Sequence, residues 1–184
     1  MIEIINSGGV TSAQGFSAGG TYAGLKTQSD TLDLGVILSE KMANVAATFT
    51  TNSIESPSVS VSRKRLVSGT ALGVVANSGC ANCSVGEQGF TDAEEMTELA
   101  ANFLGGTSND YFVASTGMIG VELPMALIRQ NLTNISLESN GGADFAKSIM
   151  TTDTKSKERA VSFMFEGKTI TVGGAAKGVG MIHP

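Results

Sequence analysis

One helical segment set among strand-like segments constrains the fold of this chain most. Residues 91–104 combine a capping pattern, Thr91 with Glu94 three positions later, with apolar residues at helical spacing. The apolar positions are Ala93, Met96, Leu99, Ala100, Phe103 and Leu104. The following pair, Gly105-Gly106, predicts the end of the helix, because glycine readily adopts the backbone conformations that close helices.

Strand patterns lie on both sides of that helix. Alternating or continuous runs of apolar and β-branched residues predict strands at 31–38, 43–51, 58–62, 72–76 and 111–115. Closely spaced glycines predict loops before the first strand, at Gly8, Gly9, Gly15, Gly19, Gly20 and Gly24. The pattern at 72–76 is followed by Asn77-Ser78-Gly79, which predicts a polar turn.

Helix and strand patterns also alternate in the second half of the chain. Two further helices are predicted at 124–131 and 143–150. Alternation around Glu166-Gly167 predicts a hairpin over residues 161–172 with a two-residue turn. We find no repeat and no linker, so we expect one domain over residues 1–184, of the α/β or α+β class.

The charge balance excludes several classes of partner. Charged residues make up 16% of the 184 residues and the net charge is −5, which argues against binding to nucleic acid or to an anionic membrane. No run of about 18 apolar residues predicts a transmembrane helix. The start of the chain lacks a signal-peptide pattern, and two cysteines are too few for a secreted disulfide scaffold. We therefore expect a cytoplasmic protein, whose low charge suggests that a partner covers part of its surface.

The last twelve residues are small and apolar, and Lys177 is the single charge among them. Glycines on both sides of Lys177 let the backbone come close to another segment or a ligand. An ammonium group held in such a setting can bind a carboxylate. Because chain ends are usually polar and exposed, this apolar end predicts one half of a protein that is cut in two.

Two polar segments follow predicted elements. Residues 114–120 come directly after a strand, and their backbone N–H groups with the Thr116 hydroxyl suit a developing oxyanion. Residues 150–154 place three hydroxyls and Asp153 after a helix, where they could hold a polar substrate. Both patterns are short and common, so, taken alone, each is better explained as an ordinary turn.

The cysteines and the single histidine give a weaker signal. Cys80 and Cys83 form a CxxC pair, which can be a redox couple or half of a zinc site. A zinc site needs about four ligands, and His183 is the one further histidine or cysteine, so no metal is expected. Free cysteines are commonly small buried apolar residues. His183 has no neighbouring nucleophile in the sequence and is not assigned a catalytic role.

Taken in order, several motifs resemble the ornithine acetyltransferase family, the bifunctional glutamate N-acetyltransferases of arginine synthesis. The resemblance covers essentially the whole chain and is carried by residues 15–16, 49–52, 77–89, 114–125, 149–154 and 177–184. The most specific of these are Ser-Thr-Gly at 115–117, Met-Thr-Thr-Asp-Thr at 150–154 and Lys-Gly-Val-Gly-Met-Ile-His-Pro at 177–184.

The resemblance implies a partner and a reaction. Precursors of this family continue with Asn-Met-Ala and cut themselves before a threonine, so this chain looks like the α subunit of a layered α/β enzyme completed by a β chain, as an α2β2 heterotetramer. The new N-terminal threonine of the β chain is the nucleophile, with its own amine as base. It takes the acetyl group from N-acetylornithine and passes it to glutamate. No metal or organic cofactor is implied, although some members also use acetyl-CoA as a donor.

The family also implies roles for residues of this chain. Thr116 and Gly117 match its oxyanion pair, and Thr151 and Lys177 match its substrate-binding threonine and lysine; Thr152 fits the same motif. One departure is Cys80, where the family usually has asparagine.

Two other interpretations remain open at the level of sequence. One is a self-cleaving aminopeptidase of the DmpA type, which shares the architecture and the N-terminal nucleophile. The other is a redox or metal-binding module built on Cys80 and Cys83.

Overall fold

The computed structural model describes residues 1–28 and 31–180, which form two β-sheets and four α-helices. The larger sheet contains β2 (Phe16–Thr21), β3 (Leu34–Asn44), β4 (Thr70–Cys80) and β5 (Tyr111–Met118), in that order. The β2–β3 and β3–β4 pairs are antiparallel, whereas β4 and β5 are parallel. The parallel pair requires a crossover, which the helix α2 (Glu87–Leu104) provides. The mixed class predicted from the sequence is confirmed.

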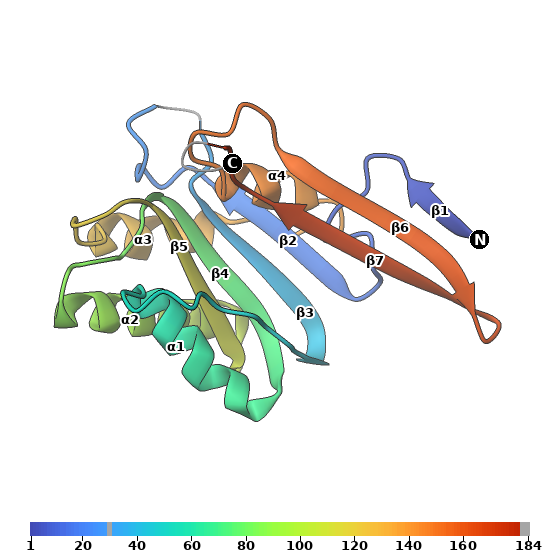
Figure 1. Cartoon of the computed structure of the whole chain (residues 1–184), viewed down its shortest axis with the longest axis horizontal. Coiled ribbons are helices and arrows are strands. Elements are labelled where there is room, and N and C mark those ends of the chain that lie inside the picture. Colours follow the sequence, from blue (N-terminus) through green and yellow to red (C-terminus); the bar gives the residue numbers. More distant parts are fainter. Residues whose placement is uncertain (29–30, 181–184) are drawn as a thin grey trace.

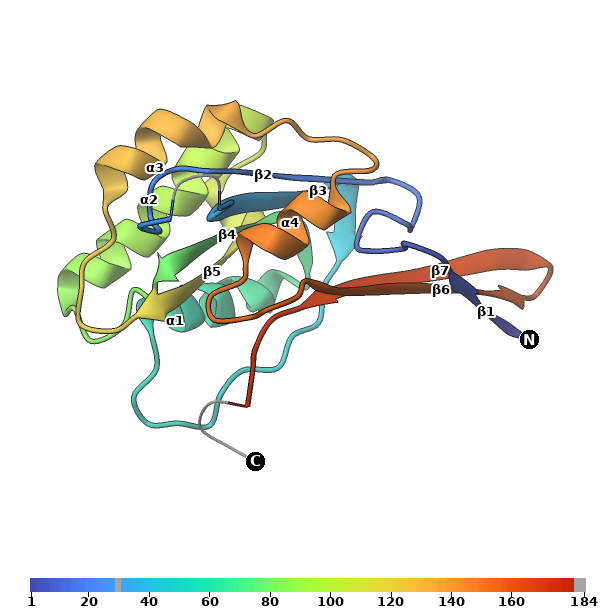
Figure 2. The same cartoon turned by 90° about the horizontal axis from the view of Figure 1, so that it is seen from above.

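Helices cover both faces of this sheet (Figure 2). On one face lie α2 and α3 (Met125–Asn131), and Met96 of α2 is fully buried against Val75 and Val113 of the sheet. Burying a methionine of this size contributes about 2 kcal/mol. On the other face, α4 (Gly142–Ser148) packs through Phe145 against Ala18 and Ala76.

The helix α1 (Pro57–Arg65) covers the free edge of β5. The Ser62 hydroxyl accepts a hydrogen bond from Val113 N–H (3.0 Å) and donates one to Val113 C=O (2.8 Å). Arg65 donates to Tyr111 C=O (2.8 Å). These contacts occupy polar groups that an edge strand leaves unpaired, and so protect the edge from other strands.

The predicted strand at 58–62 is therefore wrong. Its alternation of serine and valine also fits a helix, because Ser58, Val61, Ser62 and Arg65 are buried at the spacing of one helical face. Pro57 at the first helical position and the Ser56 hydroxyl, which accepts from Val59 N–H, start the helix.

Other local predictions also fail. The strand predicted at 43–51 stops with β3 at Asn44, and residues 45–56 form no helix or strand, because β-branched residues need a partner strand. The longest helix, α2, begins at Glu87 after Gly86, one turn before the predicted cap at Thr91. Gly19 and Gly20 lie inside β2 instead of in a loop. A Cβ atom on Gly19 would lie 2.1 Å from the Ser136 carbonyl oxygen, so a close crossing segment requires glycine there.

The smaller sheet contains β1 (Ile2–Ile5), β6 (Lys157–Phe165) and β7 (Lys168–Ala176), in the order β1-β6-β7, and all its pairs are antiparallel. It extends away from the larger sheet (Figures 1 and 2). The predicted hairpin is confirmed: Glu166 and Gly167 both have positive φ, as a two-residue type I′ turn requires. Near its other end, Ala175 of β7 packs against the cluster around Phe145, which brings the end of β7 to the larger sheet.

Many apolar side chains of the smaller sheet are exposed. They are Ile2, Ile4, Met164, Phe165, Ile170 and Val172. Among the described helices, none combines the length and the continuous hydrophobicity that crossing a bilayer requires.

Candidate functional site

The parallel strands β4 and β5 end side by side, and the candidate site begins there. Asn77-Ser78-Gly79 does not form the predicted turn but continues β4, in register with Ser115-Thr116-Gly117 of β5. Gly117 has φ +134°, and a Cβ atom on it would lie 2.3 Å from the Gly79 carbonyl carbon. β5 can approach β4 this closely because Gly117 has no side chain. A Cβ atom on Gly79 would instead lie 2.5 Å from the Leu25 carbonyl oxygen.

The covering helix α1 runs antiparallel to β5, and its first turn lies beside Ser115. There the hydroxyls of Ser58 and Ser115 form a hydrogen bond (2.9 Å). Beyond that point Thr116 is half-buried and Gly117 is exposed. Because Cys80 of β4 pairs with both residues that flank Gly117, the Gly117 N–H points to the free side of β5. A hydroxyl and a backbone N–H are thus available at one strand end.

Lys177 reaches this strand end from β7. Its ammonium group donates a hydrogen bond of 2.6 Å to the Thr116 hydroxyl oxygen, across 61 positions of sequence. A hydroxyl that accepts a bond from an ammonium group keeps its own proton for donation. The contact therefore leaves the Thr116 hydroxyl a donor, next to a positive charge.

Asp153 joins two more segments to the site. Its carboxylate accepts from Gly178 N–H (2.7 Å), from Thr151 N–H (3.3 Å) and from the Lys157 ammonium group. Its side chain has no exposed surface, although Thr151 is exposed. The Lys157 ammonium and the two backbone donors hold the pKa of the Asp153 carboxyl well below its usual range, against the opposing effect of burial.

The four residues predicted from the resemblance are thus linked in space. Thr116 and Gly117 end β5, Lys177 follows β7 and contacts Thr116, and Thr151 shares the Asp153 carboxylate with the residue after Lys177. The roles of these four residues stay predictions. Sequence reasoning noted Asp153 as part of a polar segment but missed its contact with Gly178, because no local pattern signals a partner 25 positions away.

The cysteine pair forms no recognisable metal centre. Cys80 is buried and its thiol contacts the Val121 carbonyl oxygen at 3.0 Å, whereas Cys83 is half-buried. Within residues 1–28 and 31–180, no group of three or more histidine, cysteine, aspartate or glutamate side chains could hold a metal ion. The expectation for His183 lies outside the described residues.

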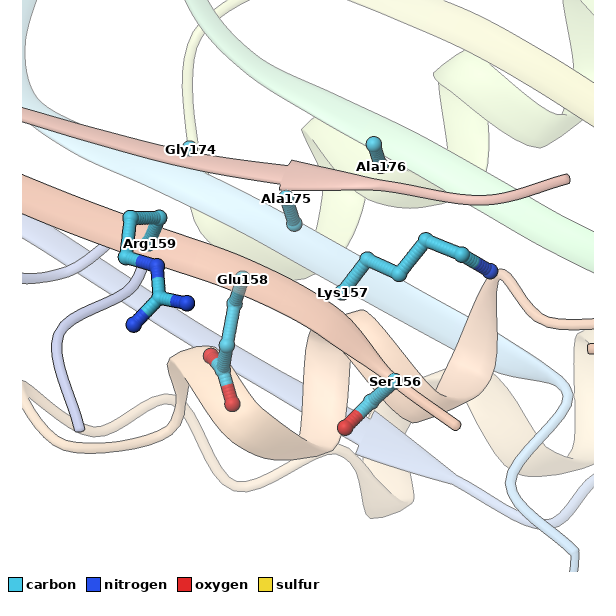
Figure 3. Close-up of a pocket in the computed structure, with 7 residues that line it drawn as sticks. All are labelled: Ser156, Lys157, Glu158, Arg159, Gly174, Ala175 and Ala176. Carbon is cyan, nitrogen blue, oxygen red and sulfur yellow. The ribbon is translucent and has the colours of Figure 1, made fainter. Parts of the chain in front are cut away.

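A broad hollow of about 520 Å³ lies on the strands next to Asp153 (Figure 3). It is lined by Ser156, Lys157, Glu158, Arg159, Gly174, Ala175 and Ala176. Lys157 extends along it, away from Arg159. The hollow is adjacent to the predicted site residues but includes none of them.

Comparison with known proteins identifies the family. The sequence model described as "ArgJ family" matches residues 17–184. The chain belongs to the ArgJ family. It is 44% identical to the "Arginine biosynthesis bifunctional protein ArgJ" of Dehalococcoides mccartyi over 184 residues, and 43% identical to the protein of that name from Caldanaerobacter subterraneus. In both cases the aligned region includes 100% of this chain but 45% of the relative. The chain therefore spans about half the length of these curated ArgJ proteins.

Two solved ArgJ-family structures share the fold. The arginine biosynthesis bifunctional protein from Bacillus halodurans is 37% identical, with a TM-score of 0.95 over 100% of this chain and 97% of the other. The ornithine acetyltransferase from Mycobacterium tuberculosis, solved with ornithine, is 34% identical, with a TM-score of 0.92 over 100% and 98%. The layered architecture expected from the resemblance is therefore confirmed.

Proposed function

We propose that this chain is the α subunit of an enzyme of arginine biosynthesis that transfers an acetyl group from N-acetylornithine to glutamate. Family membership supports the pathway, and the name of the M. tuberculosis relative supports ornithine as one product. The observation that carries the proposal is the 2.6 Å contact between Lys177 and Thr116, because it places a cation for a substrate carboxylate beside a hydroxyl donor for an oxyanion.

Each residue then has a chemical role. When a nucleophile attacks the acetyl carbonyl, the oxygen becomes negative, and the Thr116 hydroxyl and the Gly117 N–H stabilise it. Lys177 binds the substrate carboxylate, and Thr151 adds polar contacts to the same substrate. The attacking group is the N-terminal threonine of the β chain, whose own amine accepts its proton. The adduct then collapses: the bond between the acetyl carbon and the ornithine nitrogen breaks, and the threonine amine passes its proton to the departing ornithine. The amine of glutamate attacks the resulting acetyl-threonine, which releases N-acetylglutamate and restores the threonine hydroxyl.

The partner is the β chain of the same precursor. Curated relatives are about twice as long as this chain, whereas the solved chains of two relatives match its length almost completely. The difference supports separation of the precursor into two chains. The exposed apolar side chains of the β1-β6-β7 sheet suit burial against the β chain, and we propose an α2β2 assembly in the cytoplasm. Acetyl-CoA is proposed as an additional donor, and neither a metal nor an organic cofactor takes part.

The test is a product assay on the enzyme assembled from the full-length gene product. With N-acetylornithine and glutamate, ornithine and N-acetylglutamate should form in equal amounts with ping-pong kinetics, because one acetyl-enzyme links the two half-reactions. Hydrolysis of short peptides without acetyl transfer would instead support the aminopeptidase interpretation.

A further inference from the structure

We propose that Asp153 is a positioning residue, which holds Lys177 and Thr151 in place for the substrate. It does so through the N–H of Gly178, the residue after Lys177, and through the N–H of Thr151 itself. The inference rests on the proposed function, since it assigns to Asp153 the placement of two residues proposed to bind substrate.

Three donors bind the two oxygens of the Asp153 carboxylate. One oxygen accepts from Gly178 N–H at 2.7 Å and from the Lys157 ammonium group, and the other accepts from Thr151 N–H at 3.3 Å. The side chain is fully covered, although Thr151 and Thr154 on either side are exposed. Hydrogen bonds to an ionised group contribute more than neutral ones, so this carboxylate holds its partners firmly.

The backbone around Lys177 shows why such a hold is needed. Regular pairing of β7 ends at Ala176, opposite Lys157, so strand hydrogen bonds do not fix Lys177. The next residue, Gly178, has φ +132°, and its N–H is bound to Asp153. Lys177 is therefore held between the last strand pair on one side and the Asp153 carboxylate on the other. From this position its ammonium group reaches Thr116.

Lys157, the first residue of β6, binds the same carboxylate through its ammonium group. It faces Ala176 across the β6–β7 pair and also binds Asp153, so the strand end and the Asp153 loop are joined by one side chain. Lys26 is a second cation near enough to interact with Asp153. Thr151 lies on the far side of the carboxylate. A single anion thus fixes the distance between the two segments that carry Thr151 and Lys177.

The variant Asp153→Asn tests this directly, because it keeps the size of the side chain. In the wild type, Gly178 N–H binds one carboxylate oxygen and Thr151 N–H binds the other. Asparagine has one acceptor oxygen, so its NH2 group would face one of these two N–H donors. In the assembled enzyme we expect kcat/KM for N-acetylornithine to fall about 10- to 100-fold, mainly through a higher KM, because loosened binding residues weaken substrate and transition state alike.

The matched control is Asp144→Asn, which removes the same charge from an exposed Asp144–Lys147 pair on α4. It should leave both kinetic constants within about twofold of the wild type, as is usual for exposed pairs of this kind. If Asp153→Asn is as active as Asp144→Asn, with an unchanged KM, the positioning role is overturned. If the wild-type enzyme itself releases no ornithine, the proposed function fails.

Hydrogen exchange on the wild-type assembled enzyme covers the case in which Asp153→Asn does not fold. The amides of Gly178 and Thr151 should exchange at least about tenfold more slowly than the intrinsic rates for their sequence, because both are bound to a covered carboxylate. Exchange of the Gly178 amide at its intrinsic rate would overturn the inference whatever the enzyme's activity.

Discussion

Gly117 lies so close to the backbone of Gly79 that position 117 cannot carry a side chain. A Cβ atom on Gly117 would lie 2.3 Å from the carbonyl carbon of Gly79 and 2.6 Å from the backbone nitrogen of Cys80. Backbone atoms cannot move aside as a flexible side chain can. The closeness of β4 and β5 therefore fixes the position of the Thr116-Gly117 pair proposed to stabilise the oxyanion.

The variant Gly117→Ala should separate the two strand ends. We expect it to lower the free energy of unfolding of the assembled enzyme by about 3 kcal/mol, through overpacking and through a strained positive φ. Activity should fall to background. Gly120→Ala is the matched control, because Gly120 also has positive φ (+78°) but has open space around its Cβ position. It should lose only about 1 kcal/mol in denaturant unfolding, and equal losses in the two variants would show that the contact with Gly79 is unimportant.

Replacing the lysine that contacts Thr116 should weaken substrate binding. In Lys177→Met the stem is kept and the charge removed, and we expect kcat/KM for N-acetylornithine to fall about 100-fold, because a charged hydrogen bond is lost. Lys168→Met removes an exposed lysine at the other end of β7 and serves as the comparison. Steady-state kinetics with both substrates measure the effect, and similar constants for the two variants would contradict the role of Lys177.

The serine that pairs with the edge of β5 should matter for stability. Ser62→Ala leaves Val113 N–H and C=O without their partner, and both are buried. Unfolding by urea should show a loss of about 1–3 kcal/mol, the usual cost of an unpaired buried polar group. Ser60→Ala on the same helix removes a hydroxyl that faces Glu55 instead of the sheet. If Ser62→Ala is no less stable than Ser60→Ala, α1 does not hold the edge through this hydroxyl.

Stability should fall in acid through Asp153. Its pKa is lowered in the folded state, chiefly by Lys157, so folding favours the ionised form. The contribution is fully present above the unfolded pKa, about 3.9, and is lost as the pH falls toward the lower folded value. The cations near Asp153 are Lys157, which binds its carboxylate, and Lys26. Urea unfolding between pH 6 and about pH 3 should therefore show a steeper decline for the wild type than for Asp153→Asn, and parallel curves would contradict this account.

Local patterns predicted the elements that local chemistry decides. The Glu166-Gly167 turn and the helix end at Gly105 were correct, because each depends on a few adjacent residues. The segment at 58–62 failed because its alternation satisfies both a strand and a helical face, and contacts with β5 select the helix. Residues 45–51 have strand propensity but no neighbouring strand.

The candidate site depended on distant contacts that no local pattern contains. Thr116, Gly117, Thr151 and Lys177 were named through the resemblance of whole motifs, since each motif alone also fits an ordinary turn. The Lys177–Thr116 and Gly178–Asp153 contacts join segments 61 and 25 positions apart. Such pairs become visible once the sheets are assembled.

The most direct test of the central claim is intact mass spectrometry of the purified full-length gene product after incubation with N-acetylornithine. We predict two chains, with the second beginning at a threonine and heavier by one acetyl group, and with this chain unmodified. A single uncut chain, or two chains without an acetyl group on the second, would contradict the proposal that this chain is the α subunit of an acetyltransferase working through an acetyl-threonine.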